Sequence, residues 1–186
     1  DQPDPRLRPL KEIFVLAAQH AQEGIPRFPF GALDAAADVP VLEPVGSGER
    51  NRVHQGALPA LHEEMGGNLR YVISSSWRRA FSRGQIERVF TRAGVGFVVA
   101  SLHEIWETPR KLWPTERIEE IQSWLHLHHR GEPFVILDDE YSGGSLLGVG
   151  DDQNHPLAAR VVLCFLGIGL MADQLPIILG ALRRSC

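Results

Sequence analysis

Short apolar runs alternate with amphipathic stretches along this chain, and the runs predict buried strands. Runs rich in Val, Ile, Leu and Phe occur at residues 13–16, 69–73, 96–100, 134–137 and 161–165. The first run continues into Ala17 and Ala18, so its pattern fits either a short strand or the start of a helix. The other four runs are typical of strands.

Between the apolar runs, hydrophobic residues recur at helical spacing. This spacing predicts helices at 54–65, at 82–93, from 116 to about 128, and after the turn at 169–173 as far as Leu182. Gly66 and Gly67 should end the first helix, and Gly94 the second. Thr115 is the expected N-cap of the third. The buried side of that third helix should carry Ile118, Ile121, Trp124 and Leu125.

The alternation of strands and helices predicts an α/β fold, a Rossmann-like parallel sheet with helices on both faces. At 186 residues, the chain suits a single domain over 1–186. Prolines and charges indicate an extended lead-in at 1–12, and recurrent Pro and Gly indicate an irregular excursion at 25–51. In such sheets ligands bind at the carboxyl ends of the strands.

The overall charge argues against nucleic acid as the main partner. The formal net charge is −4, which gives no broad basic surface. A nucleic-acid-binding module nevertheless stays open as one hypothesis, because arginines recur locally. We expect these arginines to form a solvated helix face: Arg78, Arg79, Arg83, Arg88 and Arg92.

Cysteine usage and hydropathy together indicate a cytoplasmic protein with no membrane association. Cys164 lies within an apolar run and Cys186 is the last residue, so no disulfide framework is expected. The apolar stretch 161–182 is interrupted by Asp173 and Pro176, and neither piece is long enough to span a membrane. The N-terminal residues lack the pattern of a signal peptide.

Polar side chains follow two of the predicted strands. Ser74 and Ser75 come directly after residues 69–73, and Asp138 and Asp139 after 134–137. Taken alone, the serines suit a helix cap and the carboxylates suit a turn. Adjacent carboxylates at the end of a strand also suit a hard cation such as Mg²⁺.

Several segments, in order, resemble the conserved motifs of haloacid-dehalogenase-like (HAD) phosphohydrolases. Those similar to the second, third and fourth motifs and to the turn before the last helix are YVISSSWR (71–78), RIEEIQSWL (117–125), FVILDDE (134–140) and GIGLMAD (167–173). The sequence is similar to a small HAD group, close to the HAD domain of Swiss-army-knife RNA-repair proteins and related bacterial and phage proteins. The resemblance covers residues 54–182 and implies a HAD-like fold with no clear cap domain.

This resemblance implies a Mg²⁺-dependent phosphatase that acts on a phosphomonoester. In HAD phosphatases an aspartate attacks phosphorus, and water hydrolyses the resulting aspartyl-phosphate. The resemblance gives Ser75, with Ser74 as the alternative, a hydrogen bond to the phosphoryl oxygens, and gives Arg117 the neutralisation of developing charge. Ser75 and Arg117 are therefore the candidate catalytic residues, and both serines and Arg117 the candidate phosphate-binding residues. Asp138 and Asp139 match the Mg²⁺ ligands.

The first HAD motif, Asp-x-Asp, occurs nowhere in this chain. Family members carry it directly after the first strand, whereas residues 13–16 are followed here by Ala-Ala-Gln-His. Asp34 and Asp38 would reach the site only by an unusual path. Two hypotheses therefore stay open: a phosphohydrolase with impaired catalysis, or a non-catalytic HAD-like binding module.

The site that the resemblance implies should lie at one edge of the sheet. We expect Ser75, Arg117 and Asp138 to converge there, close enough to share a phosphate-sized ligand. Without the acids of the first motif, Mg²⁺ should bind weakly, because affinity falls with each charged ligand lost. The expected partner is a small phosphorylated ligand or a nucleic-acid end.

Overall fold

A computed structural model describes residues 11–15, 50–75, 77–110, 116–140, 143–164 and 169–183. The strands are β1 (Lys11–Val15), β2 (Leu69–Ile73), β3 (Leu102–Glu107), β4 (Phe134–Asp139) and β5 (Val161–Cys164). The α-helices are α1 (Arg50–Glu64), α2 (Trp77–Ala80), α3 (Arg83–Arg92), α4 (Gly96–Ala100), α5 (Arg117–His128) and α6 (Leu175–Arg183). Short 3-10 segments are η2 (Gly144–Leu146), η3 (Ala158–Arg160) and η4 (Ala172–Gln174).

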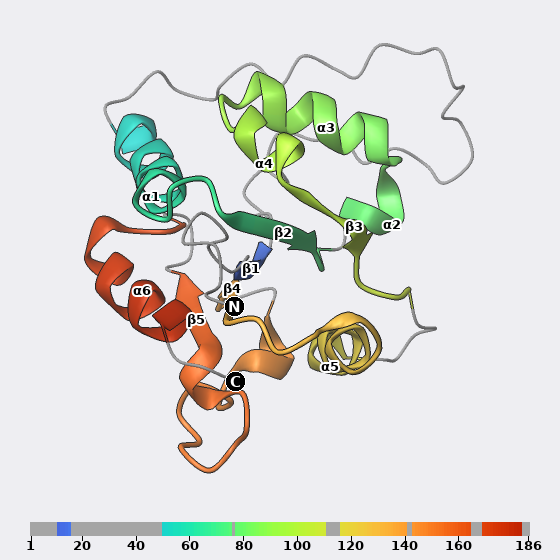
Figure 1. The fold of residues 1–186 in the computed structure, drawn as a ribbon, viewed down its shortest axis with the longest axis vertical. Coiled ribbons are helices and arrows are strands. Elements are labelled where there is room, and N and C mark those ends of the chain that lie inside the picture. Colours follow the sequence, from blue (N-terminus) through green and yellow to red (C-terminus); the bar gives the residue numbers. More distant parts are fainter. Residues whose placement is uncertain are drawn as a thin grey trace, which may run out of the picture.

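The strands form one five-stranded parallel sheet in the order β3-β2-β1-β4-β5 (Figure 1). The ambiguous first run is thus a strand, and it lies at the centre of the sheet. From β1 the chain moves outward to β2 and β3, and it then returns to β4 on the other side of β1. Ligands of such sheets bind where the strand order reverses. The predicted α/β fold with a parallel sheet is confirmed.

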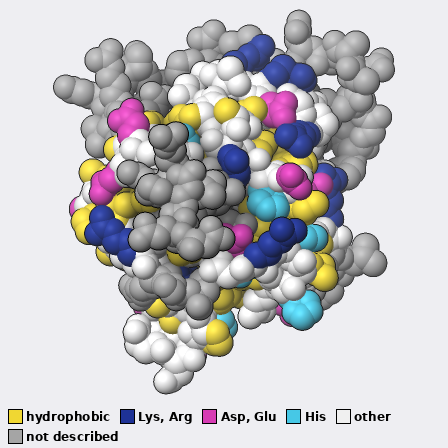
Figure 2. Space-filling model, in the orientation of Figure 1, with side chains coloured by type: hydrophobic (Ala, Val, Ile, Leu, Met, Phe, Trp, Pro, Cys, Tyr) yellow, Lys and Arg dark blue, Asp and Glu magenta, His cyan; other side chains and the backbone are white. Residues whose placement is uncertain are grey.

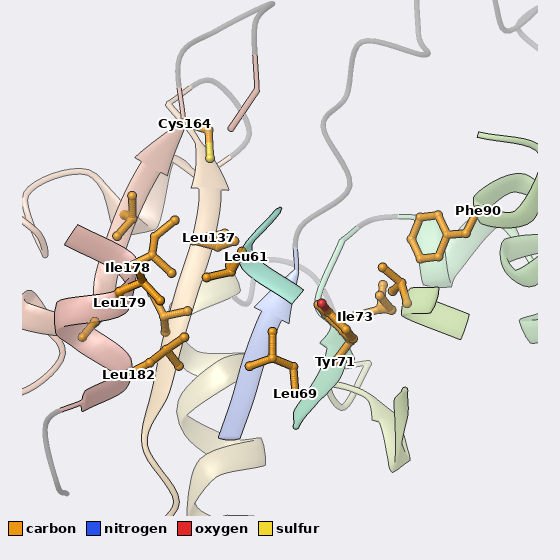
Figure 3. Close-up of a cluster of buried hydrophobic side chains, with 14 of the residues drawn as sticks. Leu61, Leu69, Tyr71, Ile73, Phe90, Leu137, Cys164, Ile178, Leu179 and Leu182 are labelled. Carbon is orange, nitrogen blue, oxygen red and sulfur yellow. The ribbon is translucent and has the colours of Figure 1, made fainter. Parts of the chain in front are cut away.

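Apolar layers cover both faces of the sheet. On one face, side chains from α1, α3, α4 and α6 pack against β2, β4 and β5 (Figures 1 and 3). On the other face, α5 packs through Ile121 and Trp124 against β2 and β4. Val135 and Leu137 belong to the first layer and Ile136 to the second, as the alternation of side chains along a strand requires. Helices therefore lie on both faces.

The prediction of a strand at 96–100 is wrong, because these residues form the helix α4. The apolar run is too short for periodicity to distinguish the two structures. In the helix, Val98 is buried beneath α3, and its neighbours are only partly covered. The strand in this region is β3, which follows at Leu102–Glu107. Its sequence is more polar than that of a buried strand because β3 lies at the edge of the sheet.

The other helices lie close to their predicted positions. α1 begins at Arg50, so the last two residues of the predicted irregular excursion are helical. The N-cap of α5 is Glu116, one residue later than the predicted Thr115, which lies outside the described residues. The predicted core positions of α5 are buried except for Leu125, which is half-buried. The residues exposed on α3, as predicted, include Arg83, Arg88 and Arg92.

None of the described helices combines the length and the apolar character that a membrane crossing demands.

Candidate functional site

The carboxyl ends of β2, β1 and β4 lie side by side at one edge of the sheet. The register pairs Val15 of β1 with Ile73 on one side and with Leu137 on the other. Ser74 and Asp138 therefore both lie one residue beyond the level of Val15, on either side of β1. Two strand spacings separate them, roughly 10 Å, a span that a phosphate group and its hydrogen bonds can bridge.

Asp138 is buried at this edge and contacts Arg117. Its Oδ2 lies 3.4 Å from Arg117 Nη1, and the two side chains are 0% and 13% exposed, respectively. Its other oxygen, Oδ1, accepts a hydrogen bond of 2.8 Å from the backbone N–H of Asp139. Arg117 is the first residue of α5, which packs on the same face of the sheet. The fold thus brings together two residues that the sequence places in separate motifs.

The loop after β4 holds Asp138 and Arg117 in place through Gly143 and Ser145, two residues that belong to none of the sequence motifs. Gly143 packs so closely that a Cβ atom on it would lie 2.5 Å from Asp138 Oδ2. Ser145 Oγ accepts a hydrogen bond of 3.1 Å from the backbone N–H of Ile118, in the first turn of α5. This bond satisfies one of the otherwise unpaired N–H groups of the helix end. It holds the Arg117 end of α5 beside the loop that covers Asp138.

The two candidate serines differ in what their hydroxyl groups do. Ser75 Oγ accepts a hydrogen bond of 3.2 Å from the backbone N–H of Trp77, at the start of α2, so it serves as a local cap. Ser74 Oγ is buried and has no hydrogen-bond partner among the described residues. A buried hydroxyl without a partner is costly. Ser74 is therefore the serine whose hydroxyl is better suited to a ligand.

Arg78 is buried, so its predicted place on a solvated helix face is wrong. Its side chain is 1% exposed. Nε donates to Thr108 O at 3.1 Å, and Nη1 donates to the carbonyls of Ser74 and Ser75, both at 2.9 Å. Nη2 donates to the carboxylate of Glu120. The guanidinium group thus ties the ends of β2 and β3 to α5, a non-local arrangement that charge patterning cannot reveal.

Glu120 lies one turn after Arg117 on α5 and forms ion pairs with two arginines. One of its carboxylate oxygens meets Arg78 and the other meets Arg79. Burial lowers the pKa of the Arg78 guanidinium, Glu120 opposes that shift, and the charges of Arg79 and Arg117 lower the pKa further. Arg117 pairs with Asp138, Arg78 and Arg79 pair with Glu120, and Arg117 lies close enough to Arg78 to influence its pKa. We call Asp138, Arg117, Arg78, Glu120 and Arg79 the edge charge network.

Asp139 does not share the surroundings of Asp138. Asp138 and Asp139 are the last two residues of β4, which extends two residues further than predicted. Since side chains alternate along a strand, Asp139 points to the face of Leu137, opposite to Arg117. Its partner in the register is Cys164 of β5. Burial raises the pKa of the Cys164 thiol to about 12, and the charges of Asp138 and Asp139 add to the rise.

The described residues do not fit a shared Mg²⁺ site at Asp138 and Asp139. The two carboxylates point to opposite faces, and the guanidinium of Arg117 already offsets the charge of Asp138. Among the described residues, no group of three or more His, Cys, Asp or Glu side chains could hold a metal ion. Asp34 and Asp38, the alternative nucleophiles, lie outside the described residues.

The comparison with known families finds a match that spans most of the chain. The family model described as the HAD domain in Swiss Army Knife RNA repair proteins matches residues 50–175, which include β2, α5, β4 and every member of the edge charge network. Comparison with curated proteins and with solved structures finds no match. Members of the HAD superfamily have a Rossmann-like fold, consistent with the parallel sheet described above. The chain belongs to the family of HAD domains found in Swiss Army Knife RNA repair proteins.

Proposed function

We propose that this domain binds the phosphate of a phosphomonoester, such as a nucleic-acid end, at the carboxyl edge of the sheet, and hydrolyses it negligibly. The supporting observation is the placement of Arg117 against Asp138, on the opposite side of β1 from the buried Ser74 hydroxyl. Arg117 offers a planar fork of donors that suits phosphate oxygens, and Ser74 Oγ offers one further donor. The family description favours a nucleic-acid end as the source of the phosphate.

The lack of a nucleophile is the reason to expect little hydrolysis. In HAD phosphatases the attacking aspartate follows the first strand, between the serine of the second motif and the acids of the fourth. Here β1 is followed in the sequence by Leu16, Ala17 and Ala18, none of which can attack phosphorus or act as a general base. Arg117 and Ser74 can orient and neutralise a phosphate group. Neither group can start the reaction.

The charges of the site lead to a test that distinguishes binding from catalysis. A bound phosphate places its negative charge beside Asp138, and the two compete for Arg117. Arg117→Gln should therefore weaken the binding of a nucleoside monophosphate about tenfold or more, because a charge-assisted hydrogen bond is lost. Asp138→Asn should strengthen binding several-fold, because repulsion is removed and Arg117 is released. Asp151→Asn, the same charge change at an exposed loop position, should have no effect.

Isothermal titration calorimetry and a phosphate-release assay with Mg²⁺ would measure both properties. We expect saturable binding and no turnover above background. Weaker binding by Asp138→Asn would contradict the proposal. Robust turnover that Asp138→Asn abolishes would identify an active phosphatase instead, and Asp34 or Asp38 would then be the first nucleophiles to test. Turnover insensitive to that substitution would indicate a contaminating enzyme.

Mg²⁺ itself should bind weakly. Asp138 is the carboxylate directed toward Arg117, and one carboxylate beside a guanidinium is a poor site for a cation that prefers several oxygen ligands. Calorimetric titration with MgCl₂ alone should give a dissociation constant in about the millimolar range or weaker. Tight binding of one Mg²⁺ per chain would mean that a further acid completes the site.

A further inference from the structure

We propose that Arg79 forms a second anion subsite beside Arg117, which receives the phosphodiester next to a terminal phosphate. The inference rests on the proposed function and specifies its ligand. A domain with both subsites would prefer a phosphorylated nucleic-acid strand to a mononucleotide. The geometry of the edge charge network points to this role.

Glu120 holds its two arginines in very different surroundings. The Arg78 side chain is 1% exposed, and its donors serve backbone carbonyls as well as Glu120. The Arg79 side chain is 42% exposed and meets the second oxygen of the same carboxylate. Arg78 is therefore a structural cation, whereas the Arg79 side chain is partly exposed beside the same carboxylate. Because Glu120 is itself 3% exposed, it is a fixed anchor for the Arg79 side chain.

The position of Glu120 sets the spacing between the two subsites. Glu120 follows Arg117 by three residues on α5, so the two share one face of the helix, with Cβ atoms about 5–6 Å apart. Arg117 contacts Asp138 at one end of the network, and Arg79 meets Glu120 at the other. A strand whose terminal phosphate lies at Arg117 would thus bring its next phosphate toward Arg79.

Charge and preorganisation both favour an anion at this position. Three guanidinium groups and two carboxylates make up the network, which leaves one excess positive charge on a chain whose net charge is −4. An arginine that is already held in place loses less side-chain entropy when it binds. Basic side chains also gather over α2 and α3 in Figure 2, and the guanidinium carbon of Arg83 in α3 lies 5.9 Å from the ring centroid of Trp106.

The test compares two probes, uridine 5′-monophosphate and a short 5′-phosphorylated oligouridylate, with the full chain and its variants. Arg79→Gln should lower affinity for the oligonucleotide roughly five- to tenfold and leave affinity for the monophosphate unchanged. The slope of log affinity against log salt concentration should fall by about one for the oligonucleotide. Arg117→Gln should weaken both probes. Arg92→Gln, an exposed arginine at the end of α3, should weaken neither.

The outcomes separate this inference from the proposed function. If Arg117→Gln leaves the monophosphate unaffected, the proposed function is wrong. If Arg117→Gln weakens both probes but Arg79→Gln weakens neither, or weakens both equally, the second subsite is wrong. If Arg79→Gln alters the thermal melting curve, the binding test uses Arg79→Lys in place of Arg79→Gln. Lysine keeps the ion pair with Glu120 but lacks the planar fork, and it should give an intermediate loss confined to the oligonucleotide.

Discussion

Replacing Arg78 with alanine is expected to lower the free energy of unfolding by about 3–5 kcal/mol, because it breaks a buried ion pair. The substitution would remove the donors that serve the carbonyls of Thr108, Ser74 and Ser75. It would also leave the carboxylate of Glu120 buried with a single arginine. A loss of this size is a large fraction of the total stability of a typical domain, about 5–15 kcal/mol.

Arg79 provides the matched control, since it contacts the same carboxylate from the solvent side. Arg79→Ala should cost less than about 1 kcal/mol, as exposed ion pairs generally do. Arg78→Lys should fall between the two, because it keeps the charge but loses the fork that reaches the carbonyls. Urea titrations followed by circular dichroism would measure all three. Equal losses from Arg78→Ala and Arg79→Ala would show that burial of the guanidinium does not matter.

Gly143→Ala is expected to destabilise the protein by about 1–3 kcal/mol, the usual cost of forcing an extra methyl group into a packed site. The new Cβ would lie 2.5 Å from Asp138 Oδ2 and 2.9 Å from the backbone carbonyl oxygen of Asp139. The carbonyl belongs to β4, next to the centre of the sheet, so it cannot move freely. The carboxylate of Asp138 would therefore have to shift, which would disturb its contact with Arg117.

The adjacent glycine is the natural control for this effect. A Cβ on Gly144 would meet no atom within 4 Å among the described residues, so Gly144→Ala should change the free energy of unfolding by less than about 0.5 kcal/mol. Chemical denaturation of both variants would give the comparison. A Gly143→Ala protein as stable as the parent would mean that the loop after β4 can move away from Asp138.

The edge charge network combines a part that supports the fold with a part that reaches solvent. The buried part of the network, Arg78 with Glu120, links β2, β3 and α5 and so contributes to the fold. Arg117 and Arg79 are the members that reach solvent. Loss of the nucleophile would remove hydrolysis and leave both the fold and an anion-binding edge in place, as the proposed function requires.

The alternation of strands and helices and the order of the motifs could be determined from sequence, because they depend on local patterns. The apolar runs at 69–73 and 134–137 lie in strands, as does the described part of the run at 161–165, although β4 continues two residues beyond its predicted end. Because parallel strands run in one direction, Ser74 and Asp138 lie at the same carboxyl edge. The run at 96–100 was the exception. Five apolar residues fit a helix as well as a strand, and packing against α3 decided between them.

Only the tertiary structure decided which charges are buried and which side chains meet. Arg78 and Arg79 are adjacent in sequence and equal in charge, yet one is internal because carbonyls from β2 and β3 and a carboxylate from α5 converge on it. Asp138 and Asp139 have different surroundings because β4 continues through both and turns them to opposite faces. These outcomes depend on contacts between segments far apart in the chain, and no local pattern contains that information.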